Sequence, residues 1–265
     1  MFDLFGNHVE QKRLLTYALQ LWRVREDSDY WIARTLDLLA WSNRMLALYK
    51  EGIEQAREAL GIFERLENME GQVECLIDLA QLLLGDRQLN GAEEAIRRSV
   101  NLTEEVPEFL LCQSSRILGD ILRAKGEREK AIHQYNKAIE IGTRFNWHHQ
   151  LFWTHYSLGR LFCSEDKFGE AHAHIERAKQ VAVNDEYYLG CAMEADAWTW
   201  YQQGRPEDAV SEALGAVEIY RKLGAAKDLE ECTAFLQDVE RLMNRRKTGS
   251  PLVKLILAVS FWKQL

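Results

Sequence analysis

The stretch of sequence that decides the fold is residues 118–138, LGDILRAKGEREKAIHQYNKA. Gly119, Ala131 and Ala138 place small side chains twelve and then seven residues apart, and Gly126 lies between the first two. Small side chains at fixed offsets allow two helices to cross closely, because the distance between helix axes depends on the side chains at the contact. The stretch therefore predicts a hairpin of two helices with a turn at Gly126.

The same pattern recurs along the chain. Four further copies are Arg44/Ala56/Phe63, Ala80/Ala92/Ser99, Gly159/Ala171/Ala178 and Ala197/Ala209/Ala216. The first of these is the weakest, because Arg44 occupies the position of the small residue. The alanines at 56, 92, 131, 171 and 209 follow one another at 36, 39, 40 and 38 residues. A self-similar period of this length predicts a solenoid of stacked helical hairpins.

Apolar residues at helical spacing, separated by turn signals, predict where the helices lie. We expect a half repeat at 8–26, repeats at about 30–66, 71–105, 108–145, 149–183 and 186–223, and a capping helix at 227–246. In the first full repeat the pair Glu51-Gly52 is expected to break a helix that runs from Tyr30 to Tyr49. One continuous, elongated array over residues 1–246 is favoured over two domains, since each repeat buries surface only against its neighbours.

Composition and charge narrow the class of protein. The formal charge is −8 and the sequence pI is about 5.5, which argues against a surface that tracks phosphates, so no nucleic acid is expected as partner. The five cysteines contain no CxxC pair and predict buried free thiols in a reducing compartment. The N-terminal residues MFDLFGNHVEQKR do not resemble a signal peptide, so we expect a cytoplasmic location.

The last residues, 247–265, depart from the repeat pattern. They include the apolar run 251–262, PLVKLILAVSFW, in which Lys254 interrupts the apolar residues. A membrane span needs roughly 20 apolar residues, so no transmembrane span is predicted. The two alternatives are a tail that folds back or hangs loose, which is favoured, and a segment that docks on a membrane surface or a partner.

No motif for catalysis, a cofactor or a metal stands out. The chain has no G-x-S-x-G, no H-E-x-x-H and no G-x-x-x-x-G-K-[ST]. Five of the seven histidines lie between 148 and 174, but zinc is disfavoured, because no suitable carboxylate or cysteine lies one helical turn from His155. His172 and His174 are expected to be half-buried and structural. We therefore predict no enzyme activity, no cofactor and no metal site.

The residues Leu118-Gly119, Gly126, Ala131, Tyr135 and Ala138 resemble the tetratricopeptide repeat. This resemblance covers about residues 30–225 and implies an all-α, right-handed superhelical solenoid of about five helical hairpins with flanking helices. It also implies that one face of the first helices lines a concave groove for a protein or peptide. The Lys/Asn carboxylate clamp of chaperone-binding members is absent, because positions 116, 120 and 123 carry Arg, Asp and Arg.

A second resemblance is to the repeat region of basidiomycete fungal proteins that carry a STAND (NLR-like) switch domain. It rests on the segments GIEQAREAL (52–60), CLIDLA (75–80), GTRFNWH (142–148), AHAHIERAK (171–179) and KLGAAKD (222–228). It implies an alternative function, a sensor or regulatory module of a signalling ATPase. This chain carries no nucleotide-binding motif, so the switch itself is not implied here.

The groove that the tetratricopeptide resemblance implies is the predicted binding site. Counting from the small residue of each first helix, its side chains are Gln113, Arg116, Asp120, Arg123, Trp153, Tyr156, Arg160, Glu194, Trp198 and Tyr201; Trp41, Met45, Glu74, Ile77 and Gln81 occupy the same offsets in the earlier repeats. Arginine next to aromatic residues is typical of binding hot spots. Packing between helices is the alternative for the aromatic residues, above all for Trp41 and Trp198. The arginines are expected to face solvent and to favour an acidic peptide as partner.

Overall fold

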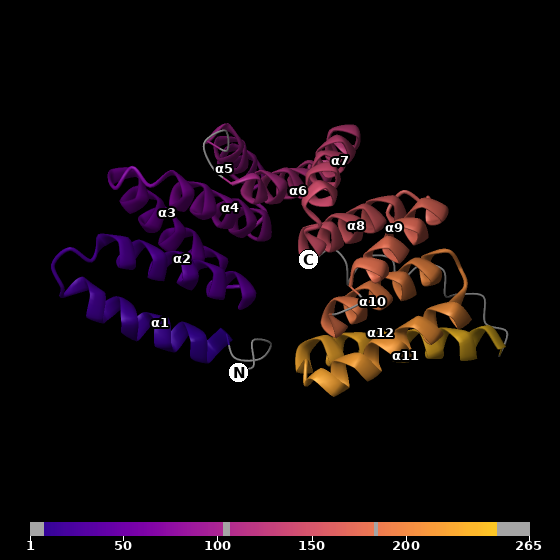
Figure 1. Ribbon diagram of the computed structural model, residues 1–265. Coiled ribbons are helices and arrows are strands. Elements are labelled where there is room, and N and C mark those ends of the chain that lie inside the picture. Colours follow the sequence, from indigo (N-terminus) through magenta and orange to yellow (C-terminus); the bar gives the residue numbers. More distant parts are fainter. Residues whose placement is uncertain (1–7, 103–106, 183–184, 248–265) are drawn as a thin grey trace. The chain divides into compact units, whose positions relative to one another are not determined.

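The computed structural model describes residues 8–102, 107–182 and 185–247. These residues form helices and turns, with no strand among them, which confirms the predicted all-α class. Figure 1 labels the helices, which are α1 (His8–Arg23), α2 (Asp29–Met45), α3 (Tyr49–Arg65), α4 (Met69–Gly85), α5 (Leu89–Leu102), α6 (Glu108–Ala124), α7 (Arg128–Phe145), α8 (His148–Cys163), α9 (Phe168–Val181), α10 (Glu186–Gln202), α11 (Pro206–Leu223) and α12 (Ala226–Lys247). The apolar tail lies outside the described residues.

The helices pair as the sequence predicts. The hairpins α2–α3, α4–α5, α6–α7 and α10–α11 pack along their length, and α1 and α12 flank the series by packing on α2 and α11. In the fourth hairpin, α8 and α9 meet where Gly159 faces Ile175, at 2.6 Å from a built Cβ to Ile175 Cγ1. The small residues are needed at these crossings, because a side chain at Gly119 would likewise meet Tyr135.

One turn geometry joins the two helices of every hairpin. Its middle residue is left-handed: Ala47, Arg87, Gly126, Asp166 and Gly204 have φ of 55°, 61°, 77°, 58° and 83°. The next amide donates to the carbonyl five residues back, for example Leu48 N to Asn43 O and Glu127 N to Leu122 O, both at 2.8 Å. This bond satisfies a carbonyl that the helix end would leave free. Only two of the five positions carry glycine, so this turn is hard to recognise from sequence.

The turn corrects the predicted register of the first repeat. The residue five positions after each left-handed residue is Ala92, Ala131, Ala171 or Ala209 in the later hairpins, and it is Gly52 in the first. Gly52 N bonds Leu48 O at 3.1 Å, as Ala131 N bonds Glu127 O at 3.0 Å. The triplet is therefore Ala40/Gly52/Ala59, and the predicted triplet Arg44/Ala56/Phe63 is wrong by one helical turn.

The predicted helix break in the same repeat is wrong too. α2 ends at Met45 and α3 begins at Tyr49, so the turn at Ala47 comes before the pair Glu51-Gly52. Gly52 lies inside α3, buried against Ala40 and Asn43 of α2. The missing side chain at Gly52 allows α2 and α3 to cross closely. Glycine is also common in turns, so the sequence alone suggests a turn at this position.

Contacts divide the chain into two compact units, Met1–Gln150 and Leu151–Leu265. The boundary falls in the first turn of α8. This boundary could not be predicted, because α8 begins without any change in composition or repeat spacing. Each unit is described by itself below, and a single continuous array stays a prediction.

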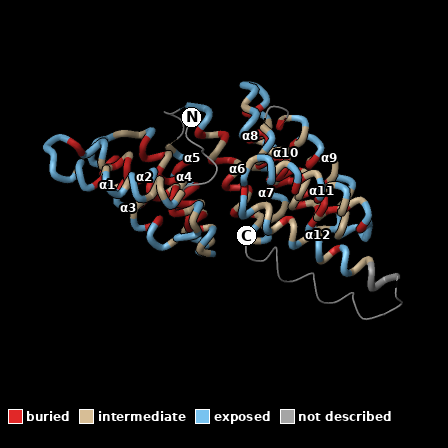
Figure 2. The backbone as a smooth tube through the Cα atoms, turned by 90° about the horizontal axis from the view of Figure 1, so that it is seen from below, coloured by how far each residue is buried: buried red, intermediate tan, exposed pale blue. Residues whose placement is uncertain are grey.

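The core of each unit follows the helix contacts, where Figure 2 shows the buried residues in red. Ala92, Ala131, Ala171 and Ala209 are each fully buried, as expected of crossing positions. The cysteines are buried free thiols, as predicted, and one lies on each first helix from α4 to α10 and one on α12: Cys75, Cys112, Cys163, Cys191 and Cys232.

Candidate functional site

The predicted groove residues lie on the first helices α6, α8 and α10. All ten are half-buried: Gln113, Arg116, Asp120, Arg123, Trp153, Tyr156, Arg160, Glu194, Trp198 and Tyr201. None belongs to the fully buried core, and all except Gln113 are charged or aromatic. Half-buried polar and aromatic side chains are suited to binding a ligand. The residues on α6 belong to unit 1, and the others belong to unit 2. Each part is therefore built up separately.

In unit 1 the first helices form one layer, because α4 packs against both α2 and α6. With the corrected register, the groove offsets on α2 are occupied by Arg34, Asp37, Trp41 and Arg44, and Met45 drops out of the row. Three charged residues of the layer were thus missed by sequence reasoning. The triplet Ala40/Gly52/Ala59 would have found them, since it gives an even spacing of 40 residues between Gly52 and Ala92.

The charges of α2 and α4 form a network. Arg34 forms an ion pair with Glu74, and its Nη1 lies 3.7 Å from Asp37 Oδ2. The Cys75 thiol donates to Asp37 Oδ1 at 3.2 Å. Burial raises the pKa of Asp37 to about 6, against the opposing effect of the Cys75 hydrogen bond and of Arg34. Carboxylates this well shielded from water are uncommon on a helix layer that serves only packing.

Asp78 on α4 is a half-buried residue of the same layer. It accepts a hydrogen bond from Gln81 Nε2 at 3.4 Å. Burial first, and then the charge of Asp37, raise the pKa of Asp78 to about 7, while Arg44 on α2 opposes the shift. Burial in turn lowers the pKa of Arg44, and the nearby charge of Arg116 acts in the same direction. Charged side chains of α2, α4 and α6 therefore influence one another's pKa values.

On α6, Arg116 and Asp120 form an ion pair at 3.0 Å, and their side chains are only 12% and 15% exposed. Tyr135 of α7 donates its hydroxyl to Asp120 Oδ1 at 2.7 Å. The expectation that Arg116 faces solvent is therefore wrong. The small Gly119 allows α7 to approach closely, so that the second helix contributes a hydroxyl to this layer.

Unit 2 carries an aromatic cluster on its first helices. Trp153 packs edge-on against Phe152, Tyr156 and Tyr188, with ring centroids 5.1, 5.5 and 5.6 Å away. Trp198 and Tyr201 of α10 pack against Phe235 of α12 at 5.5 and 5.8 Å. These contacts favour the packing alternative for Trp198, although its ring, like that of Tyr201, is only half-buried.

Acidic residues accompany these rings. Glu194 accepts a hydrogen bond from the Tyr220 hydroxyl at 2.8 Å. Burial raises the pKa of Glu194 to about 7, and the charges of Asp228 and Glu231 on α12 add to the shift. Arg160 lies over the ring of Tyr156, with its Cζ 5.7 Å from the centroid. Unit 2 therefore offers carboxylates as well as an arginine, which an acidic peptide alone does not explain.

The histidines of unit 2 are half-buried or buried and sit in structural contacts. His155 and His174 bring their Nδ1 atoms to 3.1 Å, and burial lowers the pKa of His155 to about 4. His172 bonds Asp196 at 2.6 Å, and Asp196 also pairs with Lys179 at 2.6 Å. Across the described part of the chain, no three His, Cys, Asp or Glu side chains gather as a metal site would need.

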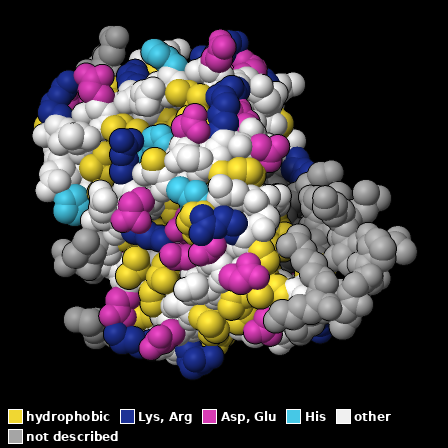
Figure 3. All heavy atoms as spheres, turned by 90° about the vertical axis from the view of Figure 1, so that its right-hand side faces the viewer, with side chains coloured by type: hydrophobic (Ala, Val, Ile, Leu, Met, Phe, Trp, Pro, Cys, Tyr) yellow, Lys and Arg dark blue, Asp and Glu magenta, His cyan; other side chains and the backbone are white. Residues whose placement is uncertain are grey.

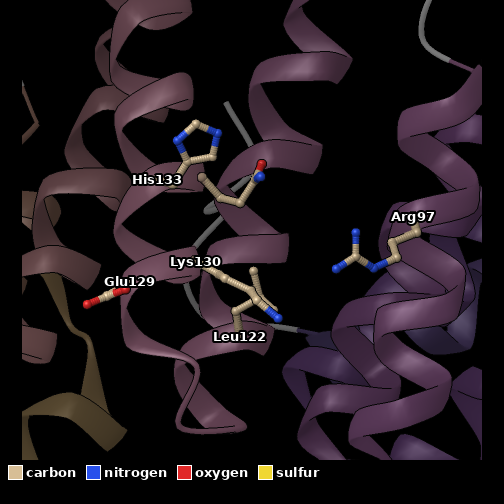
Figure 4. Close-up of a pocket in the computed structure, with 6 residues that line it drawn as sticks. Arg97, Leu122, Glu129, Lys130 and His133 are labelled. Carbon is tan, nitrogen blue, oxygen red and sulfur yellow. The ribbon is translucent and has the colours of Figure 1, made fainter.

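A hollow of about 380 Å³ lies on the second-helix side of unit 1. In Figure 4, Arg97 points from α5 toward Leu122 and Lys130. Its cations are already neutralised, because Arg97 pairs with Glu93 at 2.7 Å and Lys130 with Glu127 at 2.6 Å. On the face seen in Figure 3, charges of both signs are mixed with apolar side chains, so that face offers no basic patch. The first-helix layers remain the stronger candidate site.

Comparisons with known proteins agree with this architecture. No family model matches the sequence. A curated relative, Tetratricopeptide repeat-containing protein trd-1 of Caenorhabditis elegans, is 30% identical over 154 residues, or 58% of this chain. The chain spans 17% of the length of that relative.

Solved structures extend the comparison to the fold. A Rap protein complexed with Competence and Sporulation Factor has a TM-score of 0.66 at 15% identity, over 91% of this chain and 72% of that chain. The Rap conjugation gene regulator of the plasmid pLS20, in complex with a Phr peptide, has a TM-score of 0.61 at 14% identity, over 89% and 71% of the two chains. The chain therefore has the fold of tetratricopeptide-type repeat proteins. None of the helices described has the length and hydropathy that a membrane crossing requires.

Proposed function

We propose that the chain is a non-catalytic scaffold that binds a peptide or protein segment along its first helices. The observation that carries this proposal is the composition of the first-helix layer in unit 1. Its central positions hold charged side chains, such as Asp37, Asp78 and Arg44, where a layer made only for packing would hold apolar ones. Buried charges cost stability, so their presence favours a binding role.

Rigid presentation supports the same proposal. Side chains on packed helices have already lost most of their freedom, so a ligand immobilises little more when it docks. The structure of the similar Rap regulator is that of a complex with a peptide. That ligand belongs to that protein, and at this identity it supports only a peptide as the class of ligand to try first. The preference for an acidic peptide stays a hypothesis for unit 1, since unit 2 adds acidic residues of its own.

The test is selection of peptides from a displayed random library on the full-length protein, followed by titration of the best peptide against two variants. Gln113→Lys changes a half-buried groove position on α6, and Asn136→Lys changes an exposed position on the second helix α7. Neither side chain forms a hydrogen bond or ion pair with the described residues that the change would remove. We expect Gln113→Lys to weaken binding about tenfold, or about 1.4 kcal/mol, and Asn136→Lys to leave it unchanged.

Equal effects of the two variants would place the site elsewhere. A library that returns no peptide above background would count against peptide binding altogether. In either case the proposal would be reduced to a helical scaffold without a defined ligand face.

The alternative function, a regulatory module of a larger switch protein, is favoured by one observation. The curated relative is much longer than this chain, which spans 17% of it, so arrays of this kind occur within longer proteins. The resemblance to fungal STAND proteins is consistent with such a role. Reading the genomic sequence upstream of the gene for a G-x-x-x-x-G-K-[ST] motif tests it, because a switch domain needs that phosphate-binding loop.

A further inference from the structure

We propose that α1 is a contact surface for a second copy of this chain, and that two copies pack their α1 helices against each other in antiparallel orientation. The contact is made by four exposed apolar side chains, here called the α1 stripe: Leu14, Tyr17, Leu21 and Val24. α1 lies at one edge of unit 1, beside α2 (Figure 1). The inference does not rest on the proposed function, which concerns the first-helix layer.

The α1 stripe is continuous along one side of the helix. Its members follow one another at three, four and three residues, which places them on one face. They are 55%, 61%, 48% and 82% exposed, in chain order. The opposite side of α1, where Leu19 is buried, packs against α2. Large apolar side chains that gather on one exposed face are typical of a surface that binds another molecule.

Comparison with α3 shows that the repeat itself does not require an apolar face here. α1 precedes α2 as α3 precedes α4, and each connection contains a left-handed residue, Asp27 with φ of 54° and Glu67 with φ of 52°. These two residues are 40 positions apart, so each position of α1 corresponds to the position 40 residues later. The counterparts of the α1 stripe on α3 are Glu54, Arg57, Gly61 and Glu64. None of these is buried and three are charged, so α3 has a solvated polar face where α1 has an apolar one.

A further helix stacked on α1 as the array stacks on α3 would not cover the stripe. The buried side of α3 includes Ile53, Ala56, Leu60 and Phe63. Their counterparts on α1 are polar and exposed: Arg13, Thr16, Gln20 and Arg23. A helix packed on that side would bury these polar side chains and leave the apolar stripe in water. The stripe therefore fits a partner that approaches from outside the stacking direction of the array.

The charges at the two ends of the stripe fit a second copy as that partner. Glu10 lies four residues before Leu14, and Arg25 lies four residues after Leu21. In an antiparallel pair with its two-fold axis between positions 17 and 18, Leu14 faces Leu21 of the other copy. The same axis brings Glu10 opposite Arg25 of the other copy. A symmetric dimer needs a surface that complements itself in this way, because every contact is made twice.

Both end charges have surface partners within one chain that a second copy can replace. Glu10 pairs with Arg13, whose side chain is exposed, and the Arg25 Cζ lies 5.6 Å from the centre of the Trp22 ring. Exposed ion pairs contribute little to stability, so their exchange for contacts between copies costs little.

A lipid surface fits the stripe less well than a second copy does. The amphipathic helices that lie on membranes carry basic residues beside their apolar face. Two basic residues of α1 are already in ion pairs, Lys12 with Glu51 and Arg23 with Glu58, both at 2.8 Å. The whole chain carries a formal charge of −8, so anionic head groups would repel it. A second copy needs no excess of positive charge.

The stripe is short, which sets the strength of the dimer. Ten residues of helix extend over about 15 Å. A contact of this length falls at the small end of specific interfaces, below about 1,200 Å² in total. We therefore expect a weak dimer, with a Kd of about 10–500 µM.

The first experiment is sedimentation equilibrium of the full-length protein at concentrations from about 5 µM to about 1 mM, in about 0.15 M salt to screen the net charge. Leu21→Glu should raise the dimer Kd by at least about tenfold, because it puts a charge into an apolar contact on both copies. Leu214→Glu is the matched control, since Leu214 on α11 is 51% exposed, and it should leave the Kd within about twofold. Both positions are exposed, so circular dichroism should show the two variants equally folded.

A charge exchange then tests the antiparallel pairing. Glu10→Arg and Arg25→Glu should each raise the dimer Kd by at least about threefold, because each places like charges opposite one another. The double variant restores opposite charges at both ends, so its Kd should return to within about twofold of the unchanged protein.

Four results would overturn the inference: a monomer over the whole concentration range, equal effects of Leu21→Glu and Leu214→Glu, no recovery in the double charge variant, or a monomer that sediments with vesicles of phosphatidylcholine and phosphatidylserine unless Leu21 is replaced. The last result would assign the stripe to lipid. Failure here is separate from failure of the proposed function, because peptide titration at Gln113 reports on α6 and self-association reports on α1.

Discussion

At the scale of single residues, the small positions of the repeat decide whether hairpins can form. Ala131 lies at the crossing of α6 and α7 with no exposed surface. Ala173 of α9 is also a second-helix alanine, but it is exposed. The sequence separates the two because Ala131 follows Gly119 by twelve residues, whereas Ala173 lies outside the pattern.

Replacing both alanines with leucine tests this difference. Ala131→Leu should lower the free energy of unfolding by about 1–3 kcal/mol, because added methylene groups force neighbouring side chains out of their preferred rotamers. Ala173→Leu should change it by less than about 0.5 kcal/mol. Urea unfolding followed by circular dichroism measures both. Similar losses at the two sites would mean that the repeat register is wrong here as well.

Two glycines without close neighbours show the effect of backbone conformation alone. A side chain would meet nothing within 4 Å at Gly126 or at Gly61, but Gly126 has φ of 77°, while Gly61 lies within α3. Gly126→Ala should destabilise the protein by about 1 kcal/mol, because alanine disfavours the left-handed region. Gly61→Ala should stabilise it by about 0.5–1 kcal/mol through helix propensity. Opposite shifts in Tm are expected, and shifts of the same sign would contradict the turn geometry.

At the scale of elements, the sequence predicted twelve helices with most ends within a few residues, because turns and apolar periods agree over most of the chain. The predicted α2–α3 turn at Glu51-Gly52 is misplaced. The turn lies at Ala47, which is not a typical turn residue, whereas the glycine at position 52 is. That single error hid Arg34, Asp37 and Arg44. The network around Asp78 could not be foreseen at all, because it depends on which side chains of α2 and α6 reach over α4.

The buried carboxylate on α4 gives the element a pH dependence. The folded state raises the pKa of Asp78 from 3.8 to about 7, so it holds a proton more tightly than the unfolded chain does. The stabilisation from that proton is complete below the unfolded pKa and is lost as the pH rises through the folded pKa. Asp78→Asn should therefore flatten the fall in unfolding free energy between about pH 4 and pH 8.

The control for this pH series is Asp86→Asn, which changes a carboxylate in the turn after α4, outside the network. Its pH profile should match that of the unchanged protein. If Asp78→Asn also follows the unchanged profile, the pH dependence arises elsewhere, for example at Asp37 or Glu194.

At the scale of the whole molecule, repeat spacing predicts one elongated array, and this stays a prediction. Small-angle scattering tests it: a compact chain of this length would have a radius of gyration of about 18 Å, and a solenoid a clearly larger one. A value near the compact limit would contradict elongation. The sequence could not foresee the division after Gln150, because repeat periodicity reports local similarity and not how strongly neighbouring repeats adhere.

The distribution of thiols has a kinetic consequence. The first helices α4, α6, α8 and α10, together with α12, hold one buried cysteine each, and burial raises the pKa of every one. A thiol-reactive reagent can label such a side chain only while its helix is transiently open. Pulsed labelling followed by peptide mass spectrometry would thus time the opening of each helix in one unmodified molecule. The labelling rate of each cysteine would report how often its own helix opens.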